Sequence, residues 1–476
     1  MAAPDLIQSS YNRDDCTAGI VHVGFGAFHR AHQAVYVDRY MEQTGDLAWG
    51  IHSINLRAAE SDAFEQGASG IKNSGGYLLK TTNPENDRTY QLIRPHIAFS
   101  NWATDVENAE NAENALIPQE VKLVTITVTE SGYYLDDKGN LNVNDPVISA
   151  ELTGEQKQSL YAYLSAALKQ RATQTNLPLT ISCCDNIREN GHMLERNFQS
   201  YLSLTKQDEL LDWVKENLSF PCSMVDRITP RLTDSVRDEI EESFTGLGDT
   251  AVHAETFKQW VLENKFASDV PDLTQSGVEL VDNVFPYEEA KIRILNGGHT
   301  GLTYLGALAG YKTFDQTMKD KELRAHFDNF ESQEVLPAIS LDLPFDKEEY
   351  LAVIASRFSN EAIADALERI CMDGFTKMQI FVRPTLEGCF ERGIIPRYTL
   401  TSIASWFVYA RRFLKGNMPI EYIEPNWDKL KPMLEPGGEN LMVSSTDLWS
   451  DLPDRFNEFK PALLAAIQET ETRWPT

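Results

Sequence analysis

The stretch Ala18-Gly19-Ile20-Val21-His22-Val23-Gly24-Phe25-Gly26-Ala27-Phe28 decides the fold of this chain. Its apolar run stops at Gly24, and a helix-like stretch continues through Met41. A strand that leads through Gly-x-Gly into a helix suits a dinucleotide pyrophosphate, because the phosphates need close backbone approach and a helix N-terminus. His29 replaces the usual third glycine, and a tight turn without a ligand would look similar. We predict a dinucleotide site that includes Gly24, Phe25, Gly26 and Phe28.

Outward from this turn, strand-like and helix-like segments alternate. Residues 49–56, 121–128 and 177–182 are rich in β-branched and apolar residues, and residues 154–173 show helical periodicity. Alternating strands and helices predict a parallel sheet covered by helices. Two further segments, 77–81 and 90–99, are predicted to form a hairpin-like insertion, joined by the polar turn Asn83-Pro84-Glu85-Asn86.

The pattern changes near Phe285-Pro286, after which it is mostly helical. The predicted fold is therefore α/β, with a Rossmann-like domain over 1–284 and a mainly α-helical domain over 285–476. Such a layout is common in dehydrogenases, where catalysis occurs in the cleft between the domains. Helices are expected at 288–309, 314–331, 347–357, 361–372, 375–381, 403–414 and 453–471.

Composition narrows the class of protein. The formal net charge of −28 argues against nucleic acid as a partner, because phosphate binding needs a basic face. The six cysteines contain no C-x-x-C pair, so reduced thiols are expected rather than a disulfide framework. No signal peptide or apolar membrane span is evident, and a cytoplasmic protein without membrane contact is expected.

Several motifs together carry a resemblance to a known family. They are Val23 to Gln33, Thr127 to Tyr133, Ser182-Cys183-Cys184-Asp185-Asn186, Met224 to Pro230 and Lys291 to His299. In order and spacing they closely resemble the polyol-specific long-chain dehydrogenases, the mannitol dehydrogenase family. The resemblance spans most of the chain. It implies NAD(P)-linked, metal-independent oxidoreduction of a CH–OH group, and it places Thr127 and Val128 at the cofactor.

The segment Lys291-Ile292-Arg293-Ile294-Leu295-Asn296-Gly297-Gly298-His299 resembles the family's catalytic Lys-x4-Asn-x2-His element. If the segment is α-helical, Lys291 and His299 fall within about a quarter-turn of each other at roughly 100° per residue. Asn296 and His299 are then neighbours at i, i+3. The alternative is an amphipathic helix with solvated polar residues. Two adjacent glycines count against it, because they cost helix stability.

These residues suggest a mechanism. Lys291 is the candidate general base for alcohol oxidation and the general acid for ketose reduction. Asn296 and Asn186 are expected to donate hydrogen bonds to the alkoxide-like oxygen, and His299 to orient the substrate. Glu130 follows the strand over 121–128 and is a candidate to relay the proton of the lysine toward solvent.

The resemblance also assigns substrate contacts to Asp226, Arg369 and Lys377. The alternative role for these side chains is ordinary ion pairing on a surface helix. Phe375-Thr376 and Ser131 depart from the family pattern, which leaves the particular substrate open. The first guess is mannitol and fructose. The alternatives are a hexuronate reductase, acting on fructuronate or tagaturonate, and an inactive nucleotide-binding regulatory protein. An intact set of catalytic residues argues against the last.

The choice of cofactor and the absence of a metal rest on a few side chains. Glu60 and Asp62 favour NAD, because an acidic group binds the ribose hydroxyls and repels a 2′-phosphate. Asn55 and Arg57 would tolerate NADP, so NAD is expected and NADP remains an alternative. A metal site is not expected, because no recognisable ligand set accompanies the histidines His22, His29, His32 and His192.

Overall fold

The computed structural model describes residues 4–136 and 138–475 of the chain. Its contacts form two compact units. The first unit contains the residues up to Thr82 together with Asp87–Phe285, and the second contains Asn83–Asn86 together with the residues from Pro286 onward. None of the helices in the described residues combines the length and apolar character that a membrane crossing requires.

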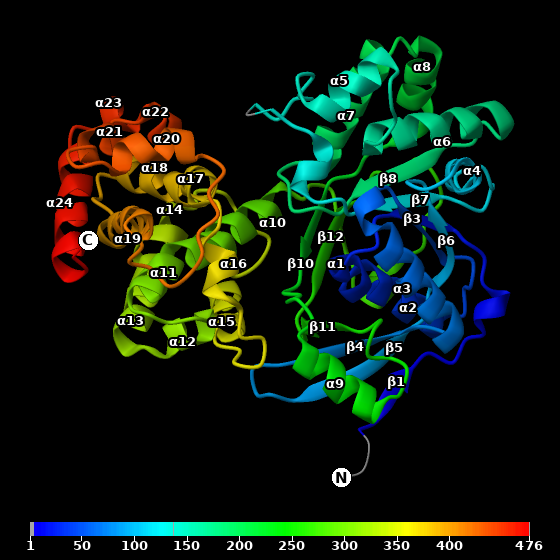
Figure 1. The fold of residues 1–476 in the computed structure, drawn as a ribbon, viewed down its shortest axis with the longest axis horizontal. Coiled ribbons are helices and arrows are strands. Elements are labelled where there is room, and N and C mark those ends of the chain that lie inside the picture. Colours follow the sequence, from blue (N-terminus) through cyan, green and yellow to red (C-terminus); the bar gives the residue numbers. More distant parts are fainter. Residues whose placement is uncertain (1–3, 137, 476) are drawn as a thin grey trace. The chain divides into compact units, whose positions relative to one another are not determined.

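The first unit is built on a parallel sheet of six strands in the order β6-β3-β2-β7-β8-β9 (Figure 1). The strands are β2 (Ile20–Val23), β3 (Ile51–Asn55), β6 (His96–Asn101), β7 (Leu123–Ile126), β8 (Leu179–Cys183) and β9 (Leu218–Ser219). From β2 the sheet grows to one side through β3 and β6, and the chain then crosses to β7 on the other side of β2. This doubly wound order confirms the predicted Rossmann-like fold and puts the topological switch point between β2 and β7.

Helices cover both faces of this sheet. Successive side chains along β2 point to opposite faces, so each face needs a layer that buries them. Val21 and Val23 belong to a core with residues of α4, α6 and α7, whereas Ile20 belongs to a second core with residues of α2. The helices of the unit are α1 (Ala27–Ala31), α2 (Gln33–Thr44), α3 (Ser61–Ser74), α4 (Val106–Asn114), α5 (Pro146–Thr153), α6 (Leu160–Gln174), α7 (Asn190–Leu204), α8 (Asp208–Asn217) and α9 (Asp234–Ser243).

Two smaller sheets complete the unit. One has the order β1-β5-β4-β11, and the other β10-β12-β13. Their strands are β1 (Leu6–Gln8), β4 (Tyr77–Thr82), β5 (Arg88–Ile93), β10 (Ser223–Asp226), β11 (Val252–Glu255), β12 (Gln259–Glu263) and β13 (Glu279–Val281). The predicted hairpin exists as the antiparallel pair β4–β5. Its second arm is shorter than predicted, because the chain breaks at Pro95 and continues as β6 beside β3.

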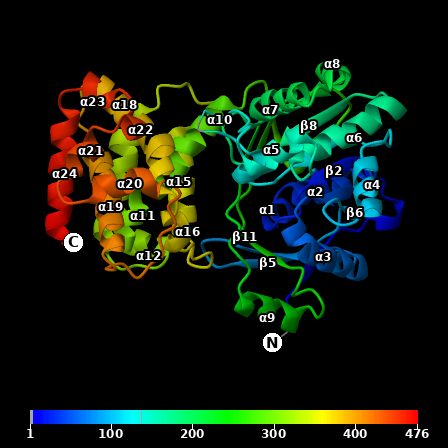
Figure 2. The same ribbon diagram turned by 45° about the horizontal axis from the view of Figure 1, so that its top comes forward.

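The second unit is helical, as predicted, and its core surrounds α11, which packs against α19, while α19 also packs against α24 (Figure 2). The helices are α10 (Phe285–Ala290), α11 (Gly297–Leu308), α12 (Phe314–Lys319), α13 (Lys321–Asn329), α14 (Leu336–Ala338), α15 (Lys347–Phe358), α16 (Leu367–Cys371), α17 (Gly374–Lys377), α18 (Arg383–Glu391), α19 (Arg397–Leu414), α20 (Trp427–Leu434), α21 (Glu439–Val443), α22 (Thr446–Trp449), α23 (Leu452–Arg455) and α24 (Phe459–Arg473).

Two expectations about these helices are corrected. The helix expected over 361–372 begins only at Leu367, because Ala366 is extended and pairs with Thr313 in an isolated bridge. Three segments, Lys291–Asn296, Phe330–Val335 and Met378–Val382, are π-helices rather than α-helices. The π form, with i→i+5 bonding, is rare and frequently occurs at functional sites.

A buried arginine stabilises the first unit. Arg171 in α6 is fully buried, and its guanidinium donates to the backbone carbonyls of Leu116, Val121, Leu177 and Pro178 at 2.6–3.1 Å. These carbonyls belong to the segments that enter β7 and β8. Since a buried carbonyl without a donor costs about 1–3 kcal/mol, Arg171 compensates several such groups at once.

Replacing Arg171 by Met should therefore destabilise the first unit by at least about 3 kcal/mol, since several carbonyls lose their donor together. Calorimetry of the unfolding transitions measures the loss. Arg196→Met is the matched control, because Arg196 is exposed and its guanidinium donates to the carbonyl of Gly139 in a surface loop. An equal loss in both variants would contradict the role of Arg171.

Candidate active site

The turn after β2 is fixed by glycine. Gly24 has φ +102°, and a Cβ atom on it would lie 2.1 Å from the Thr127 carbonyl oxygen. Its N–H donates to the Ile54 carbonyl, and the Thr127 N–H donates to the Val23 carbonyl, both at 2.9 Å. A side chain at position 24 would therefore force apart β2 and the segment after β7. By contrast, no atom lies within 4 Å of the Cβ position of Gly26, which leaves room for the backbone approach that a pyrophosphate requires.

The histidine in place of the third glycine has a packing role. The His29 ring stacks on His22 of β2 with centroids 3.3 Å apart, and its Nε2 lies 3.0 Å from His96 Nε2. A third glycine normally allows helix and strand to pack closely, whereas here two flat rings fill that space. Burial lowers the pKa of His22 and His29 well below the usual value and that of His96 to about 3. The cluster is therefore neutral near pH 7.

Two of the predicted cofactor residues line one cavity of about 1010 Å³ in the first unit, together with Asn55, Arg30 and Arg237. These two are Phe25 and Glu60. Glu60 is exposed and forms an ion pair with Arg57, at 2.7 Å. Phe28 is not among the lining residues and instead stacks on His32, with ring centroids 5.0 Å apart. The cavity therefore offers an apolar wall, a carboxylate and two arginines, which suit an adenosine and its phosphates.

Asp185 organises the loop that carries Glu130, and the sequence analysis assigned it no role. Its carboxylate accepts hydrogen bonds from the N–H groups of Val128 (2.8 Å) and Thr129 (3.1 Å) and from the Tyr133 hydroxyl (2.6 Å). Burial raises the pKa of Asp185 to about 6. Thr127 is also held, because its hydroxyl lies 3.0 Å from His22 Nε2. The ends of β7 and β8 thus bring Thr127, Val128 and Glu130 beside the segment with Asn186.

Asp226 lies elsewhere in the first unit. It is the last residue of β10, is buried, and pairs with Gln259 of β12 in the sheet register.

In the second unit, Lys291 begins the π-helical segment that leads into α11. The predicted α-helical spacing from Lys291 to His299 is therefore wrong in detail, because the π segment widens the first turns. The exposure pattern is nevertheless informative. Within Lys291–Leu308, only Asn296 and His299 are not fully buried. A helix buried on nearly every side thus leaves two polar residues partly exposed, three positions apart on one face.

His299 lies in an aromatic recess beside a carboxylate. Its ring stacks on Phe358 and meets Phe314 edge-on, with centroids 4.4 Å apart in both cases. Its Nε2 is 3.9 Å from Asp365 Oδ2. Burial lowers the pKa of His299 to about 3; Asp365 opposes this shift, and the charges of Arg369 and Lys377 contribute to it. His299 is therefore neutral near pH 7, and it is positioned by rings rather than by an ion pair.

The structure brings the predicted substrate residues Arg369 and Lys377 to this neighbourhood of His299. The Arg369 guanidinium pairs with both oxygens of Asp365, and the Lys377 ammonium donates to the Ile370 carbonyl at 2.7 Å. Burial lowers the pKa of Lys377 to about 8, and the charge of Arg369 contributes to this shift. Asp365, which has no sequence motif to mark it, thus lies between Arg369 and His299.

A second unexpected acid lies behind the helix. Glu331 is fully buried, and neither of its carboxylate oxygens has a hydrogen-bond partner. A Cβ on Gly298 would lie 2.5 Å from Glu331 Oε1, so the glycine has a packing reason. Burial raises the pKa of Glu331 well above its usual value, although Arg293 opposes the shift. Glu331 is therefore a protonated acid packed against the segment that carries Asn296 and His299.

The raised pKa of Glu331 should make the stability of the second unit depend on pH. The folded-state pKa of Glu331 is raised, so the folded chain holds a proton that the unfolded chain loses above about pH 4.5. The free energy of unfolding should therefore fall as the pH rises above about 4.5, by about 1.4 kcal/mol per pH unit at most. Glu331→Gln should remove this slope.

Calorimetry of the transition of the second unit between pH 5 and 8 tests the effect, with exposed Glu348→Gln as the control. A slope that is the same in Glu331→Gln and the native chain would show that Glu331 does not hold the proton.

Comparison with known proteins agrees with this geometry. Residues 18–275 match the mannitol dehydrogenase Rossmann domain, and residues 283–469 match the mannitol dehydrogenase C-terminal domain. The chain is 37% identical over 404 residues to the D-arabinitol 4-dehydrogenase of Klebsiella pneumoniae, covering 84% of this chain and 86% of that protein. It is 33% identical over 472 residues to the mannitol 2-dehydrogenase of Cereibacter sphaeroides, covering 98% and 96%.

Solved structures extend the similarity to the whole fold. The mannitol 2-dehydrogenase of Pseudomonas fluorescens, solved in a ternary complex with NAD and D-mannitol, matches with a TM-score of 0.84 at 30% identity. The match covers 98% of this chain and 94% of that one. A substrate-free D-sorbitol dehydrogenase matches with a TM-score of 0.86 at 29% identity, covering 98% and 96%. With both domain matches and relatives of this similarity along nearly its full length, the chain belongs to the mannitol dehydrogenase family.

Proposed function

We propose that this chain interconverts a sugar alcohol and its ketose, with Lys291 as general acid/base and without a catalytic metal. The observation that carries the proposal is the burial of Lys291–Leu308, in which only Asn296 and His299 are partly exposed rather than buried. The proposal assigns cofactor binding to residues 1–284 and substrate binding to residues 285–476. The Gly24 turn and the cavity at Phe25 and Glu60 support the first assignment.

The side chains have distinct proposed roles. A nicotinamide cofactor, when bound, supplies the hydride acceptor. Lys291, buried in the protein, accepts the hydroxyl proton as the alcohol is oxidised and returns it to the oxygen in the reverse direction. Asn296 and Asn186 donate to the oxygen as negative charge develops. His299, neutral and held by Phe358 and Phe314, orients a substrate hydroxyl, and Glu130 passes the proton toward solvent.

A neutral polyol is favoured over a hexuronate. The charge of Arg369 is already compensated by Asp365, and Lys377 donates to a backbone carbonyl. A carboxylate substrate would have to compete with Asp365 for Arg369. Asp226 is proposed to contact a further hydroxyl. Mannitol with fructose is the first substrate pair, and the 37% identity to a D-arabinitol 4-dehydrogenase makes D-arabinitol with xylulose the second.

Replacing Lys291 by Met should lower kcat for ketose reduction by about 10²–10⁴-fold, because proton transfer by a positioned side chain contributes that much. The measurement is the initial rate of NADH and NADPH oxidation with fructose, xylulose, fructuronate and tagaturonate, with a chelator present. Lys321→Met, at an exposed position of α13, is the matched control. Unchanged turnover in Lys291→Met, or turnover abolished by the chelator, would contradict the proposal. A preference for the hexuronates would identify the reductase instead.

NAD is the proposed cofactor, with NADP accepted, because the ion pair with Arg57 partly compensates the charge of Glu60. In this proposal Glu60 accepts hydrogen bonds from the ribose hydroxyls of NAD, and Arg57 pairs with the 2′-phosphate of NADP. Thr127 and Val128, at the switch point between β2 and β7, are proposed to line the same cofactor.

Arg57→Ala should therefore raise the preference for NAD over NADP by about tenfold, a change of about 1.4 kcal/mol, and Glu60→Gln should lower it. The ratio of kcat/KM for the two cofactors measures the preference, with Arg196→Ala as the control. If neither variant changes the ratio, this pair does not select the cofactor.

A further inference from the structure

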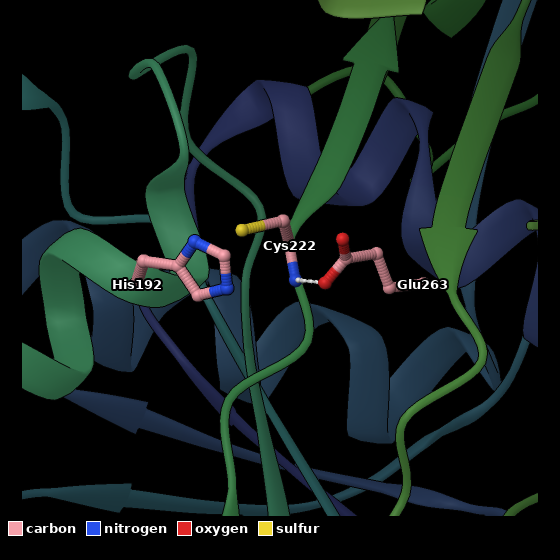
Figure 3. A group of neighbouring side chains, drawn as sticks. All are labelled: His192, Cys222 and Glu263. Atoms are coloured by element: carbon pink, nitrogen blue, oxygen red, sulfur yellow. Dashed lines mark hydrogen bonds between the residues drawn. The ribbon is translucent and has the colours of Figure 1, made fainter. Parts of the chain in front are cut away.

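Three potential metal ligands meet in the first unit, and none of them is among the residues proposed for catalysis. His192 of α7, Cys222 just before β10 and Glu263 at the end of β12 point toward one another (Figure 3). Their donor atoms all lie within 4.8 Å of one another. The sequence analysis found no ligand set around His192, because the other two residues are far from it in the chain and are brought to it only by the fold.

The backbone fixes two of these ligands relative to each other. β10 and β12 are antiparallel with Ser223 opposite Leu262, so Cys222 and Glu263 face each other one step further along. The Glu263 N–H donates to the Cys222 carbonyl at 3.0 Å, and the Cys222 N–H donates to Glu263 Oε2 at 3.1 Å. Both side chains are buried, so the sheet holds thiol and carboxylate in one place.

The third ligand is held by the start of α7. The Asn190 side chain donates to the Ser223 carbonyl and accepts from the Ser223 N–H, both at 2.9 Å. A Cβ on Gly191 would lie 2.4 Å from the Phe220 carbonyl oxygen, so the helix approaches this segment as closely as a glycine allows. The backbone of His192 therefore lies close to the segment that carries Cys222. Its side chain is about half exposed (49%), which leaves it free to adjust and leaves water access to the cluster.

A thiolate, an imidazole and a carboxylate are ligands typical of Zn²⁺, which binds them at about 2.0–2.3 Å. Tetrahedral coordination would bring the donor atoms to about 3.5 Å from one another, a small contraction of the observed cluster. Glu189 Oε1 lies 3.7 Å from His192 Nδ1, and an outer carboxylate of this kind orients a ligating imidazole. Water would take the fourth position.

One nearby cation opposes binding. The Lys265 ammonium lies 3.1 Å from Glu263 Oε2, the oxygen that also accepts from the Cys222 N–H. The Lys265 side chain is 53% exposed, so it can move into solvent when a second positive charge arrives. Glu263 Oε1 takes part in neither bond and is the oxygen suited to an ion.

We propose that His192, Cys222 and Glu263 bind one zinc-like divalent ion, which ties the start of α7 to the β10–β12 pair. Binding releases the thiol proton of Cys222 to solvent, so affinity rises with pH. The site is structural and adds nothing to the proton transfer assigned to Lys291. Its existence is independent of the proposed activity.

Co²⁺ added to the metal-stripped full chain tests the proposal, because a thiolate ligand gives cobalt a sulfur charge-transfer absorption. We expect one equivalent of this absorption in the native chain. Cys222→Ser should abolish it, and His192→Ala, at an exposed helix position, should weaken cobalt binding by about 100-fold or more. Cys16→Ser is the control, because Cys16 is a free thiol outside the cluster.

The Tm of thermal unfolding is a second measure of metal binding that does not depend on the absorption of cobalt. Zn²⁺ should raise the Tm of the native chain and of Cys16→Ser, and should leave Cys222→Ser and His192→Ala unchanged. Absence of cobalt absorption in the native chain, absorption that persists in Cys222→Ser, or an equal effect of Zn²⁺ on all four proteins would each overturn the proposal.

Discussion

The close approach of Gly24 to the Thr127 carbonyl is the constraint on which the first unit depends. It joins the ends of β3, β2 and β7 through the bonds from Gly24 to Ile54 and from Thr127 to Val23. The chain can turn from β2 into α1 here only because position 24 has no side chain. The same contact fixes Thr127, and through the adjacent Asp185 bonds it fixes the loop with Glu130. One residue without a Cβ therefore aligns both loops of the switch point.

The second unit depends on a different constraint. It must bury the helical segment Lys291–Leu308, which carries polar side chains. The π-helical turns at Lys291–Asn296, Phe330–Val335 and Met378–Val382 belong to segments that contact one another. The first two contain buried charged side chains, such as Arg293 and Glu331, whereas the third buries Met378 and Val382. The wider turns change which side chains share a face. Asn296 and His299 keep their exposure while the residues around them are enclosed.

The sequence predicted the features that depend on local pattern. The apolar run into Gly24-x-Gly26 identified the first strand and its turn, and alternating strands and helices identified the sheet. The family motifs led to the segment Lys291 to His299. Longer-range features were not predictable in this way. Pro95 separates two strands that the sequence analysis treated as the single segment 90–99, and the π-helical turns have no recognisable periodicity.

The residues that were missed share one property, which is that their partners are distant in the chain. Asp185 acts on Val128 and Thr129, and its place in a quoted motif was the only available signal. Asp365 owes its position beside His299 to the fold of the segment before α16. Glu331 is the last residue of the helix expected over 314–331, and the sequence pattern gave no sign that its side chain is buried. The role of His29 was also hidden, because its stacking partner His22 lies on another element.

The buried histidines affect the charge of the protein, because their rings stay neutral in mild acid. Burial lowers the pKa of eight of its nine histidines. The formal charge of −28 counts every histidine as neutral, and for those eight the fold keeps this true well below pH 6.5. Unfolding in mild acid must take up protons on these rings, because the unfolded chain binds them and the folded chain does not. In mild acid these eight rings therefore add no positive charge to the native protein, and each buried ring adds to the acid dependence of its unfolding.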